Sequence, residues 1–510
     1  MTPDAVVTAS PIPYLVLLAS LLPALAIFPL REGQVRTRTA INLGGALVKI
    51  ALVVALIPPV VNGEKQRASF EWVPGIEIVL VTDSFGLFFG ALSAVLWLVT
   101  TVYAVGYLEG SPNRSRFFGF FSLCVTATAG IGLAGNLLTF LIFFEMLTLV
   151  TYPLVAHRGT AAAFAGARRY LAYTLTGGVV LLAGVVWLTA EVGPVEFTSG
   201  GVDAVARLAQ EEPVTVTAIA AMMLVGVGVK AAILPLHGWL PAAMVAPAPV
   251  SALLHAVAVV KAGAFGVVRV VHDVFGAELL ARLGLLTVLA VTAAVTILYG
   301  SVRALTQDDL KKRLAYSTVS QLSYVALGAA LLSPLAVAGA LVHVVNQGVM
   351  KITLFFCAGL FAEELRVSRV SELAGVGRRM PLAGAAFTVA ALGMIGLPPL
   401  AGFVSKWALA SGALQAGDGW VVPVLLTSTV LNAAYFLPVV YRMWALPPAD
   451  DAPWAQEDDG ARPRARLGAP LALVAPPVVT AALTIALGVA AGLPYSPWAI
   501  AQVIAGQVLP

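Results

Sequence analysis

The chain has 510 residues, of which 59% are hydrophobic and only 11% are charged, and its mean hydropathy is +0.92. A soluble chain carries about 25% charged residues, so this chain could not cover a water-facing surface, and we exclude a soluble enzyme and a disordered protein. The net charge of +4 is spread between apolar runs and not gathered in one basic patch, so we expect no nucleic-acid partner. The composition predicts a polytopic membrane protein.

About fourteen apolar runs are long enough to cross a hydrocarbon core of ~30 Å, which takes ~20 helical residues. In chain order they span roughly 13–30, 41–61, 83–107, 117–134, 137–156, 170–190, 214–234, 250–273, 282–300, 313–332, 336–361, 381–415, 420–444 and 469–492. No basic residue precedes the first run, so we interpret it as a retained span and not as a cleaved signal. The twelfth run is too long for one straight helix. The predicted fold is an all-α polytopic membrane protein with about 14 transmembrane helices.

The charges of the loops predict the orientation of the chain. With the N-terminus outside, four basic residues lie in outer loops, namely Lys65, Arg67, Arg207 and Arg282. Twenty lie in inner loops, namely Arg31, Arg36, Arg38, Arg114, Arg116, Arg158, Arg168, Arg169, Arg303, Lys311, Lys312, Arg313, Arg366, Arg369, Arg378, Arg379, Arg442, Arg462, Arg464 and Arg466. This asymmetry favours an even number of spans, with both termini outside a cell membrane. The sizeable loops, 62–82, 191–213 and 445–468, are too short for a soluble catalytic domain.

Two cysteines, Cys124 and Cys357, lie far apart in apolar stretches and form no CxxC pair. This pattern argues against an iron–sulfur, zinc or disulfide framework. We therefore expect neither a metal site nor a cofactor in the chain.

Several ionisable residues fall inside the apolar runs, where each charge costs at least ~2.5 kcal/mol. They are Lys49, Glu145, Lys230, Lys261, Arg269, Lys351 and Lys406, with His255 and His343. A medium of low dielectric disfavours the charged form of such groups, so groups of this kind can exchange protons near neutral pH. Structural ion pairs, or side chains that reach the membrane surface, are the alternative. We favour that alternative for Lys49 and Arg269, and a transport role for Glu145, Lys230 and Lys406.

Three polar stripes follow helical spacing in otherwise apolar runs. They comprise Glu145, Thr148 and Tyr152; His343, Gln347 and Lys351; and Ser317, Ser320, Gln321 and Tyr324. Such faces can hold a file of waters, or they can bond to neighbouring helices, which is the commoner use of Ser and Thr in membranes. Three stripes in a chain that also buries lysines favour the file of waters.

Prolines and glycines interrupt the seventh run around Lys230 and the twelfth run before Lys406. The two segments read GVGVKAAILPLHGWLPAAMVAPAP and GMIGLPPLAGFVSKWALASG. Proline opens the helical hydrogen-bond ladder, and irregular backbone at membrane depth persists only where protein or a water-filled cavity satisfies it. Two such helices five spans apart predict two five-helix repeats, inverted because each has an odd number of spans. The alternative is that the prolines only kink two helices for packing.

The predicted units follow from these repeats. They are an N-terminal three-helix segment (1–116), a first inverted repeat of spans 4–8 (117–273), a second of spans 9–13 (274–444), and an inner loop with the fourteenth helix (445–510).

Four segments resemble the antiporter-like proton-channel subunits shared by respiratory complex I, membrane-bound hydrogenases and Mrp-type sodium/proton antiporters. They read KAAILPLHGWLPAAMVAPAPVSALLHAVAVVKAG, DDLKKRLAYSTVSQLSYVALG, HVVNQGVMKITLFFCAG and GLPPLAGFVSKW. The resemblance extends from about residue 80 to 440. It implies fourteen helices with two inverted five-helix repeats, each with a discontinuous helix, and a subunit that works inside a hetero-oligomeric membrane complex.

The resemblance also implies roles for seven residues. Glu145 is similar to the family's carboxylate on the fifth helix, and Lys230 to the lysine on the broken seventh helix that is its electrostatic partner. The others are His255 and Lys261 on the eighth helix, His343 and Lys351 in the relay of the eleventh helix, and Lys406 at the exit on the broken twelfth helix. Two positions depart from parts of the family: Gln347 stands where several relatives carry a second histidine, and Lys406 where some branches place a glutamate.

The expected function is proton translocation, with Na⁺ as the expected counter-ion, by one subunit of a multisubunit antiporter in the lipid bilayer. The chain ends about eighteen residues after the fourteenth run and shows no long amphipathic helix there, which favours a resemblance to the D subunit of Mrp or its hydrogenase counterpart. The alternative is a proton-pumping membrane subunit of a complex I-like NADH-quinone oxidoreductase or a hydrogenase, again with no redox centre in this chain.

Two further classes of protein remain open. A redox subunit could bind quinone or haem through His237, His255, His272 or His343, although a lone membrane histidine is more often a core residue. A structural scaffold would explain the hydrophobicity but not the buried lysines.

Overall fold

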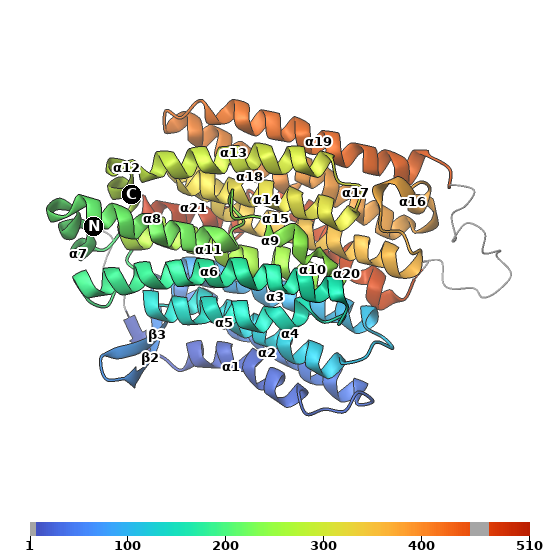
Figure 1. Ribbon diagram of the computed structural model, residues 1–510, viewed down its shortest axis with the longest axis horizontal. Coiled ribbons are helices and arrows are strands. Elements are labelled where there is room, and N and C mark those ends of the chain that lie inside the picture. The colour runs from blue at the N-terminus through green and yellow to red at the C-terminus, as the bar shows by residue number, and fades with distance from the viewer. Residues whose placement is uncertain (1–6, 449–468, 510) are drawn as a thin grey trace.

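The computed structural model describes residues 7–448 and 469–509, in which long helices run side by side along the longest axis of the molecule (Figure 1). The predicted inner-loop residues Arg462, Arg464 and Arg466 lie outside this described part. Strands β2 and β3 and the C-terminal helix lie at one end of the bundle, while helix α16 lies at the other.

The first part of the chain, up to residue 282, forms twelve α-helices and two irregular ones. They are α1 (Ile12–Ile27), α2 (Val35–Val61), α3 (Ser84–Tyr107), α4 (Arg114–Leu133), α5 (Leu137–Val155), α6 (Ala161–Val192), α7 (Asp203–Glu211), α8 (Pro213–Lys230), α9 (Trp239–Ala242), the 3₁₀ helix η1 (Ala243–Val245), α10 (Ala248–Ala256), α11 (Val259–Val268), the π-helix η2 (Arg269–Phe275) and α12 (Ala277–Arg282).

The second part continues the bundle. It forms α13 (Leu285–Leu305), α14 (Leu310–Ala329), α15 (Pro334–Glu364), the 3₁₀ helix η3 (Val370–Glu372), α16 (Val376–Arg379), α17 (Pro381–Ile395), α18 (Ala401–Gln415), α19 (Val421–Ala445), α20 (Leu471–Val489) and α21 (Pro497–Val508). Helix α15 is buried along its whole central length, so the other helices pack around it.

Within the described residues, eleven helices are long and apolar enough to cross a membrane, counting Ala248–Phe275 as one. They correspond to all the predicted runs except the first, tenth and twelfth. The first run is the shorter helix α1, the tenth is the more polar α14, and the twelfth is divided between α17 and α18. The protein is therefore a mostly helical polytopic membrane protein, while the number of fourteen crossings and the inverted repeats remain predictions.

Both interruptions expected from the prolines are confirmed. Helix α8 ends at Lys230, and residues 231–238 are not helical before the short α9 begins. Helix α17 ends at Ile395, and α18 begins only at Ala401. A third interruption, at Val257 and Ala258 between α10 and α11, was not predicted.

A three-stranded sheet covers one end of the bundle, where the sequence analysis expects only loops. Strand β1 (Val7–Ala9) pairs in parallel with β2 (Lys65–Val73), which pairs antiparallel with β3 (Ile76–Thr82). The register places Gln66 opposite Thr82, with a bulge between Glu71 and Val73. The hairpin is thus a small exception to the all-α prediction.

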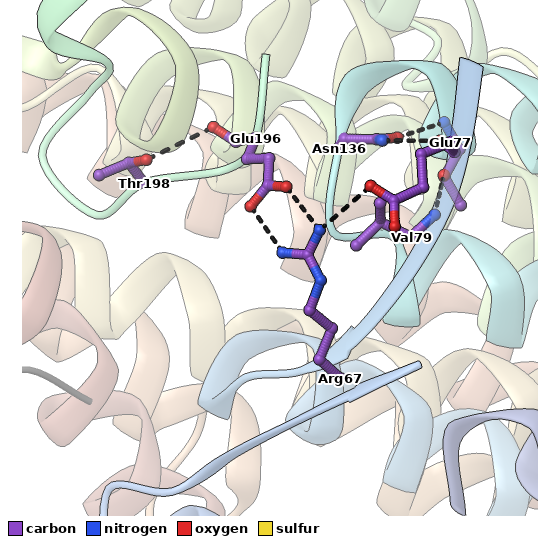
Figure 2. Close-up of polar contacts among 7 residues, drawn as sticks. Arg67, Glu77, Val79, Asn136, Glu196 and Thr198 are labelled. Atoms are coloured by element: carbon purple, nitrogen blue, oxygen red, sulfur yellow. Dashed lines mark hydrogen bonds and ion pairs between the residues drawn. The ribbon is translucent and has the colours of Figure 1, made fainter. Parts of the chain in front are cut away.

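An ion-pair cluster fixes this hairpin to the neighbouring loops (Figure 2). The guanidinium of Arg67 on β2 donates two hydrogen bonds to Glu196, at 2.9 and 2.8 Å, and its Nη2 lies 3.4 Å from Glu77 on β3. Asn136 donates to the carbonyl of Glu77 at 3.0 Å and caps α5 by accepting from the amide of Thr139 at 2.8 Å. These contacts hold the start of α5 in place from outside the bundle. Helix α5 is the one that carries Glu145.

Candidate functional site

Glu145 on α5 and Lys230 at the end of α8 form an ion pair inside the bundle. The Nζ atom of Lys230 lies 3.4 Å from Oε1 of Glu145, and 3.4 Å from the ring centroid of Phe144, and it donates to the carbonyl of Phe144. The side chain of Lys230 is fully buried, whereas 27% of the Glu145 side chain is exposed. Opposite charges at this separation attract by about 5 kcal/mol at an effective dielectric of 20. Each group therefore stabilises the charged form of the other.

The end of α8 and a glycine on α6 accommodate this ion pair. Lys230 occupies the last turn of α8, where the carbonyl end of a helix favours a positive charge. The indole of Trp239 donates to the carbonyl of Val229 at 2.8 Å and so satisfies part of this helix end. Gly178 on α6 faces the carboxylate: a Cβ atom there would lie 2.5 Å from Oε1 of Glu145. A side chain at this position would therefore displace the carboxylate, which is the movable end of the Glu145 side chain.

Lys261 on α11 connects the break after α8 to the central helix α15. Helix α11 approaches this break closely, since a Cβ atom on Gly263 would lie 2.1 Å from the amide nitrogen of Ala231. The fully buried Lys261 donates to the carbonyl of Val344 at 2.7 Å and to Oε1 of Gln347, both on α15.

His343 lies one turn before Gln347 on α15 and connects this helix to α18. Its Nδ1 atom lies 2.8 Å from Oγ of Ser405, and its ring stacks on Tyr324 with the centroids 5.3 Å apart. Lys406, which follows Ser405 on α18, has its Nζ atom 5.5 Å from the centroid of the same Tyr324 ring. The polar contacts from α11 thus reach the broken helix α17–α18.

Lys406 is held by the open end of α17. Its Nζ atom donates to the carbonyls of Met394 at 3.0 Å and Ile395 at 2.9 Å, and lies 3.5 Å from Oγ1 of Thr429. These carbonyls are free to accept because α17 stops at Ile395 and has no following turn to bond them. The helix break thus supplies the acceptors for Lys406.

A second set of contacts joins Lys351 to Lys406. Lys351 donates to Oγ of Ser317 at 2.8 Å, and the hydroxyl oxygen of Tyr435 lies 2.9 Å from the same Oγ. Tyr435 also bonds to Asn432, whose amide donates at 3.4 Å to the Met394 carbonyl that Lys406 also contacts. Asn432 and Tyr435 were not predicted from the sequence. Their i, i+3 spacing places them on one face of the thirteenth run, and this spacing could have identified them.

Several buried polar atoms near these helices have no hydrogen-bond partner within the described residues. They are both ring nitrogens of His255, both amide atoms of Gln321, the hydroxyl of Tyr324, Nε2 of His343 and Nε2 of Gln347. The ring of His255 stacks on Phe355 at 4.5 Å between centroids. Buried polar groups are normally bonded to protein or to ordered water. These atoms belong to α10, α14 and α15, and their hydrogen-bonding capacity is unused within the described residues.

The family model described as "NADH:quinone oxidoreductase/Mrp antiporter, TM" matches residues 134–432, which is more than half of the chain and includes all seven predicted site residues. The chain belongs to this family. The predicted resemblance to antiporter-like membrane subunits is thereby confirmed.

Individual members of the NADH:quinone oxidoreductase/Mrp antiporter family are similar over different lengths. The chain is 36% identical over 487 residues to NADH-quinone oxidoreductase subunit N of Desulforudis audaxviator (strain MP104C), with 94% of this chain and 95% of that protein covered. It is 34% identical over 364 residues to a probable K(+)/H(+) antiporter subunit of Rhizobium meliloti (strain 1021), a match that covers 71% of this chain but 36% of that protein. A chain in the solved structure of the Mrp complex from Dietzia sp. DQ12-45-1b has a TM-score of 0.83 at 25% identity, with 97% of this chain and 98% of that chain covered.

Two charged residues of this NADH:quinone oxidoreductase/Mrp antiporter family member lie apart from the contacts described so far. Arg269 has Nη2 at 2.6 Å from Oδ2 of Asp83 and Nη1 at 2.8 Å from Oδ2 of Asp273, which is the arrangement expected of a structural ion pair. Lys49 is fully buried and donates to Oγ of Ser20 at 2.9 Å, and none of the ion pairs in the described residues includes it. Lys49 therefore neither pairs with an acid here nor reaches the membrane surface.

Side chains that bind metals are not grouped in the described residues of this family member. No set of three or more His, Cys, Asp or Glu side chains within that part of the chain could hold a metal ion. Cys124 and Cys357 are both buried and unpaired with each other.

Proposed function

We propose that this chain is a proton-translocating subunit of a multisubunit monovalent cation/proton antiporter of the cell membrane, of the same type as the D subunit of Mrp. The observation that carries the proposal is the buried pair of Glu145 and Lys230 at a helix break, followed by polar contacts that lead towards Lys406 at a second break. The similarity to a chain of an Mrp complex supports it. We also propose the predicted orientation, with both termini outside, and the two inverted repeats, 117–273 and 274–444.

The ion pair supplies the driving step. While Glu145 and Lys230 are 3.4 Å apart, their attraction of about 5 kcal/mol holds both in the charged form. When the two separate, this attraction is lost, so the lysine releases a proton more readily and the carboxylate takes one up more readily. Movement of the partner subunits or of the broken helix can therefore be converted into transfer of a proton.

The proton then passes from Lys230 towards Lys261 and α15. Gln347 cannot titrate, so it orients the proton donors and acceptors between Lys261 and His343 rather than carrying the proton itself. His343 and Ser405 lead to Lys406, and the contacts through Ser317, Tyr435 and Asn432 connect Lys351 to the same lysine. His255 is placed beside this path by the stacking of its ring on Phe355 of α15, the helix that also carries Lys351.

The transport assay compares three variants in vesicles that contain the assembled complex. Glu145→Ala and Lys230→Ala each remove one member of the buried pair, and we expect both to abolish proton exchange driven by Na⁺ or K⁺ while assembly on a native gel persists. Arg369→Ala is the matched control, because it removes one member of an exposed ion pair with Glu372 and is expected to leave transport unchanged. Near-normal transport in both buried-pair variants would reject the assigned roles. Parallel assays with each cation identify the counter-ion.

A second function is favoured by the similarity to NADH-quinone oxidoreductase subunit N, because that match covers 95% of the relative's length. In that case the chain is the proton-pumping membrane subunit of a complex I-like assembly, with the same path and no redox centre of its own. The subunits that co-purify distinguish the two: small hydrophobic companions indicate an antiporter, and iron–sulfur or flavin subunits indicate a redox pump.

A further inference from the structure

An apolar groove of about 500 Å³ has no lining residue on α5 or α8, the helices of the Glu145–Lys230 pair. Its floor is formed by α3 and α15, through residues such as Leu92 and Val349, and its walls are formed by α2, α20 and α21, through residues such as Ile57, Leu487 and Ile500. Apolar side chains at its rim, among them Val95 on α3, are exposed at the surface of the bundle. In the single chain the groove is therefore open at the surface of the bundle, and its volume is that of an ordinary ligand site.

A polar pocket of about 670 Å³ continues the groove at the end of the bundle that carries the hairpin. The two cavities share five lining residues, Val60, Gly63, Ser84, Ile504 and Gln507. They therefore form one cavity whose lining changes from apolar to polar along its length. An occupant must be amphiphilic in the same direction.

The length of the apolar part matches one leaflet of a bilayer. Along α3 the groove extends from Ser84 to Leu96, which is about 18 Å at the helical rise of 1.5 Å per residue. Half of a hydrocarbon core of ~30 Å is about 15 Å. An acyl chain that lies along the groove therefore stays within one leaflet.

The charges of the polar pocket select the headgroup. Three acids, Glu64, Asp83 and Asp273, and two bases, Lys65 and Arg269, line it, which leaves one net negative charge. Arg269 is already paired with both aspartates, whereas Glu64 and Lys65 form no ion pair within the described residues. A free lysine beside a free carboxylate complements a phosphate and an ammonium group, and a primary ammonium can donate hydrogen bonds to carboxylates.

We infer that this cavity binds one molecule of phosphatidylethanolamine, with an acyl chain along α3 and the headgroup against Glu64 and Lys65. The inference goes beyond the proposed function, because it assigns a lipid site remote from the proton path. The inferred lipid site does not depend on which complex contains the chain.

Lipid retention by the full chain, purified within its complex, tests this assignment. The complex is reconstituted in bilayers with equal parts of phosphatidylethanolamine, phosphatidylglycerol and phosphatidylcholine, and bound lipid is counted by native mass spectrometry. Val95→Trp places an indole in the groove, and Val54→Trp is the matched control, since Val54 on α2 is exposed but lies outside the groove. We expect the wild type and Val54→Trp to retain one phosphatidylethanolamine per chain, and Val95→Trp to retain about tenfold less, as a loss of one decade in affinity gives.

A second variant tests the headgroup. Glu64→Lys changes the net charge of the pocket from minus one to plus one, so we expect the preference to shift towards phosphatidylglycerol. Equal retention of the three lipids by the wild type, unchanged retention in Val95→Trp, or recovery of a quinone or a cross-linked protein segment from the groove would overturn the inference.

Discussion

Lys230 and Lys406 are both buried beside helix breaks, yet they are surrounded by different chemistry. Lys230 faces the carboxylate of Glu145 at 3.4 Å, whereas Lys406 faces the backbone carbonyls of Met394 and Ile395. None of the ion pairs among the described residues includes Lys406. A carboxylate can move away from its lysine and can also take up a proton. A backbone carbonyl can move away but does not take up a proton. We therefore propose that the first site controls proton release by separation of charges, and that the second site receives and passes on a proton.

The largest effect is expected at Lys406. Lys406→Gln keeps amide donors for the two carbonyls but cannot carry a proton, so we expect proton exchange in vesicles to be abolished while the complex assembles normally. Lys406→Glu would place a carboxylate against carbonyl oxygens, and we expect it to reduce assembly as well.

The neighbouring residue offers the control for this experiment. Trp407 is 65% exposed on the outer face of α18, so Trp407→Leu is expected to leave proton exchange intact. Near-normal exchange in Lys406→Gln would mean that the proton leaves by a route that avoids Lys406, and the comparison of the two lysines would then fail.

Gly178 allows the Glu145 side of the comparison to be tested without removing either charge. In Gly178→Ala the added Cβ atom would lie 2.5 Å from Oε1 of Glu145, so the carboxylate must move away from its position beside Lys230. We expect proton exchange to fall by about tenfold, which corresponds to a change of about 1.4 kcal/mol. Gly44→Ala on α2 is the matched control, because a Cβ atom there meets nothing within 4 Å. Equal exchange rates in the two variants would show that the position of the carboxylate is unimportant.

A single proline such as Pro153 leaves its helix, α5, continuous. The sequence predicted the two lysine-bearing breaks because several prolines and glycines fall close together there. It did not predict the break at Val257 and Ala258, since the segment LLHAVAVVKAG contains no proline and its glycine lies after the break. Ala258 adopts φ −113° and ψ −90°, a conformation that packing and not local preference imposes. This break separates His255 from Lys261, so the shape of the eighth span could be known only from the folded chain.

The candidate site was predictable to a similar extent. Helical spacing identified the polar faces of α14 and α15, on which Ser317 and Lys351 lie, but spacing does not reveal which face of another helix lies opposite. The contact of Lys351 with Ser317, and that of His343 with Ser405, therefore appear only in the structure. The hairpin in residues 62–82 was not predicted, because the length and charge of a loop do not reveal whether it contains paired strands.

A smaller effect is expected at Ser405, which joins His343 to the helix that carries Lys406. Ser405→Ala removes the 2.8 Å contact with Nδ1 of His343. A hydrogen bond of this kind contributes about 0.5–1.5 kcal/mol, so we expect proton exchange to fall between about twofold and tenfold. Ser405→Thr keeps the hydroxyl and should restore most of the activity. If both variants behave alike, the path does not depend on this hydroxyl.

The smallest effect is expected at Glu32, an acid at the membrane end that sharpens the contrast with Glu145. Its carboxylate accepts from the amides of Arg114 at 2.9 Å and Ser115 at 3.2 Å, in the first turn of α4. Partial burial acts to raise the pKa of Glu32, but the two amide donors and the charges of Arg38 and Arg114 outweigh it and lower the pKa below 4.5. A group whose pKa is lowered by folding stabilises the protein above the pKa of the unfolded chain, and this contribution is lost as the pH falls through the folded pKa.

Glu32→Gln is therefore expected to lower the stability at pH 7 by about 0.5–1 kcal/mol, as for other groups that cap a helix. Thermal unfolding in detergent should show a lower Tm for the variant at pH 7 and a difference that shrinks towards pH 3, while proton exchange at pH 7 stays at the wild-type rate. A Tm difference that is the same at both pH values would show that the amide contacts of Glu32 do not depend on its charge. A loss of proton exchange would instead place an acid from outside the bundle on the proton path, and the contrast between Glu32 and Glu145 would no longer hold.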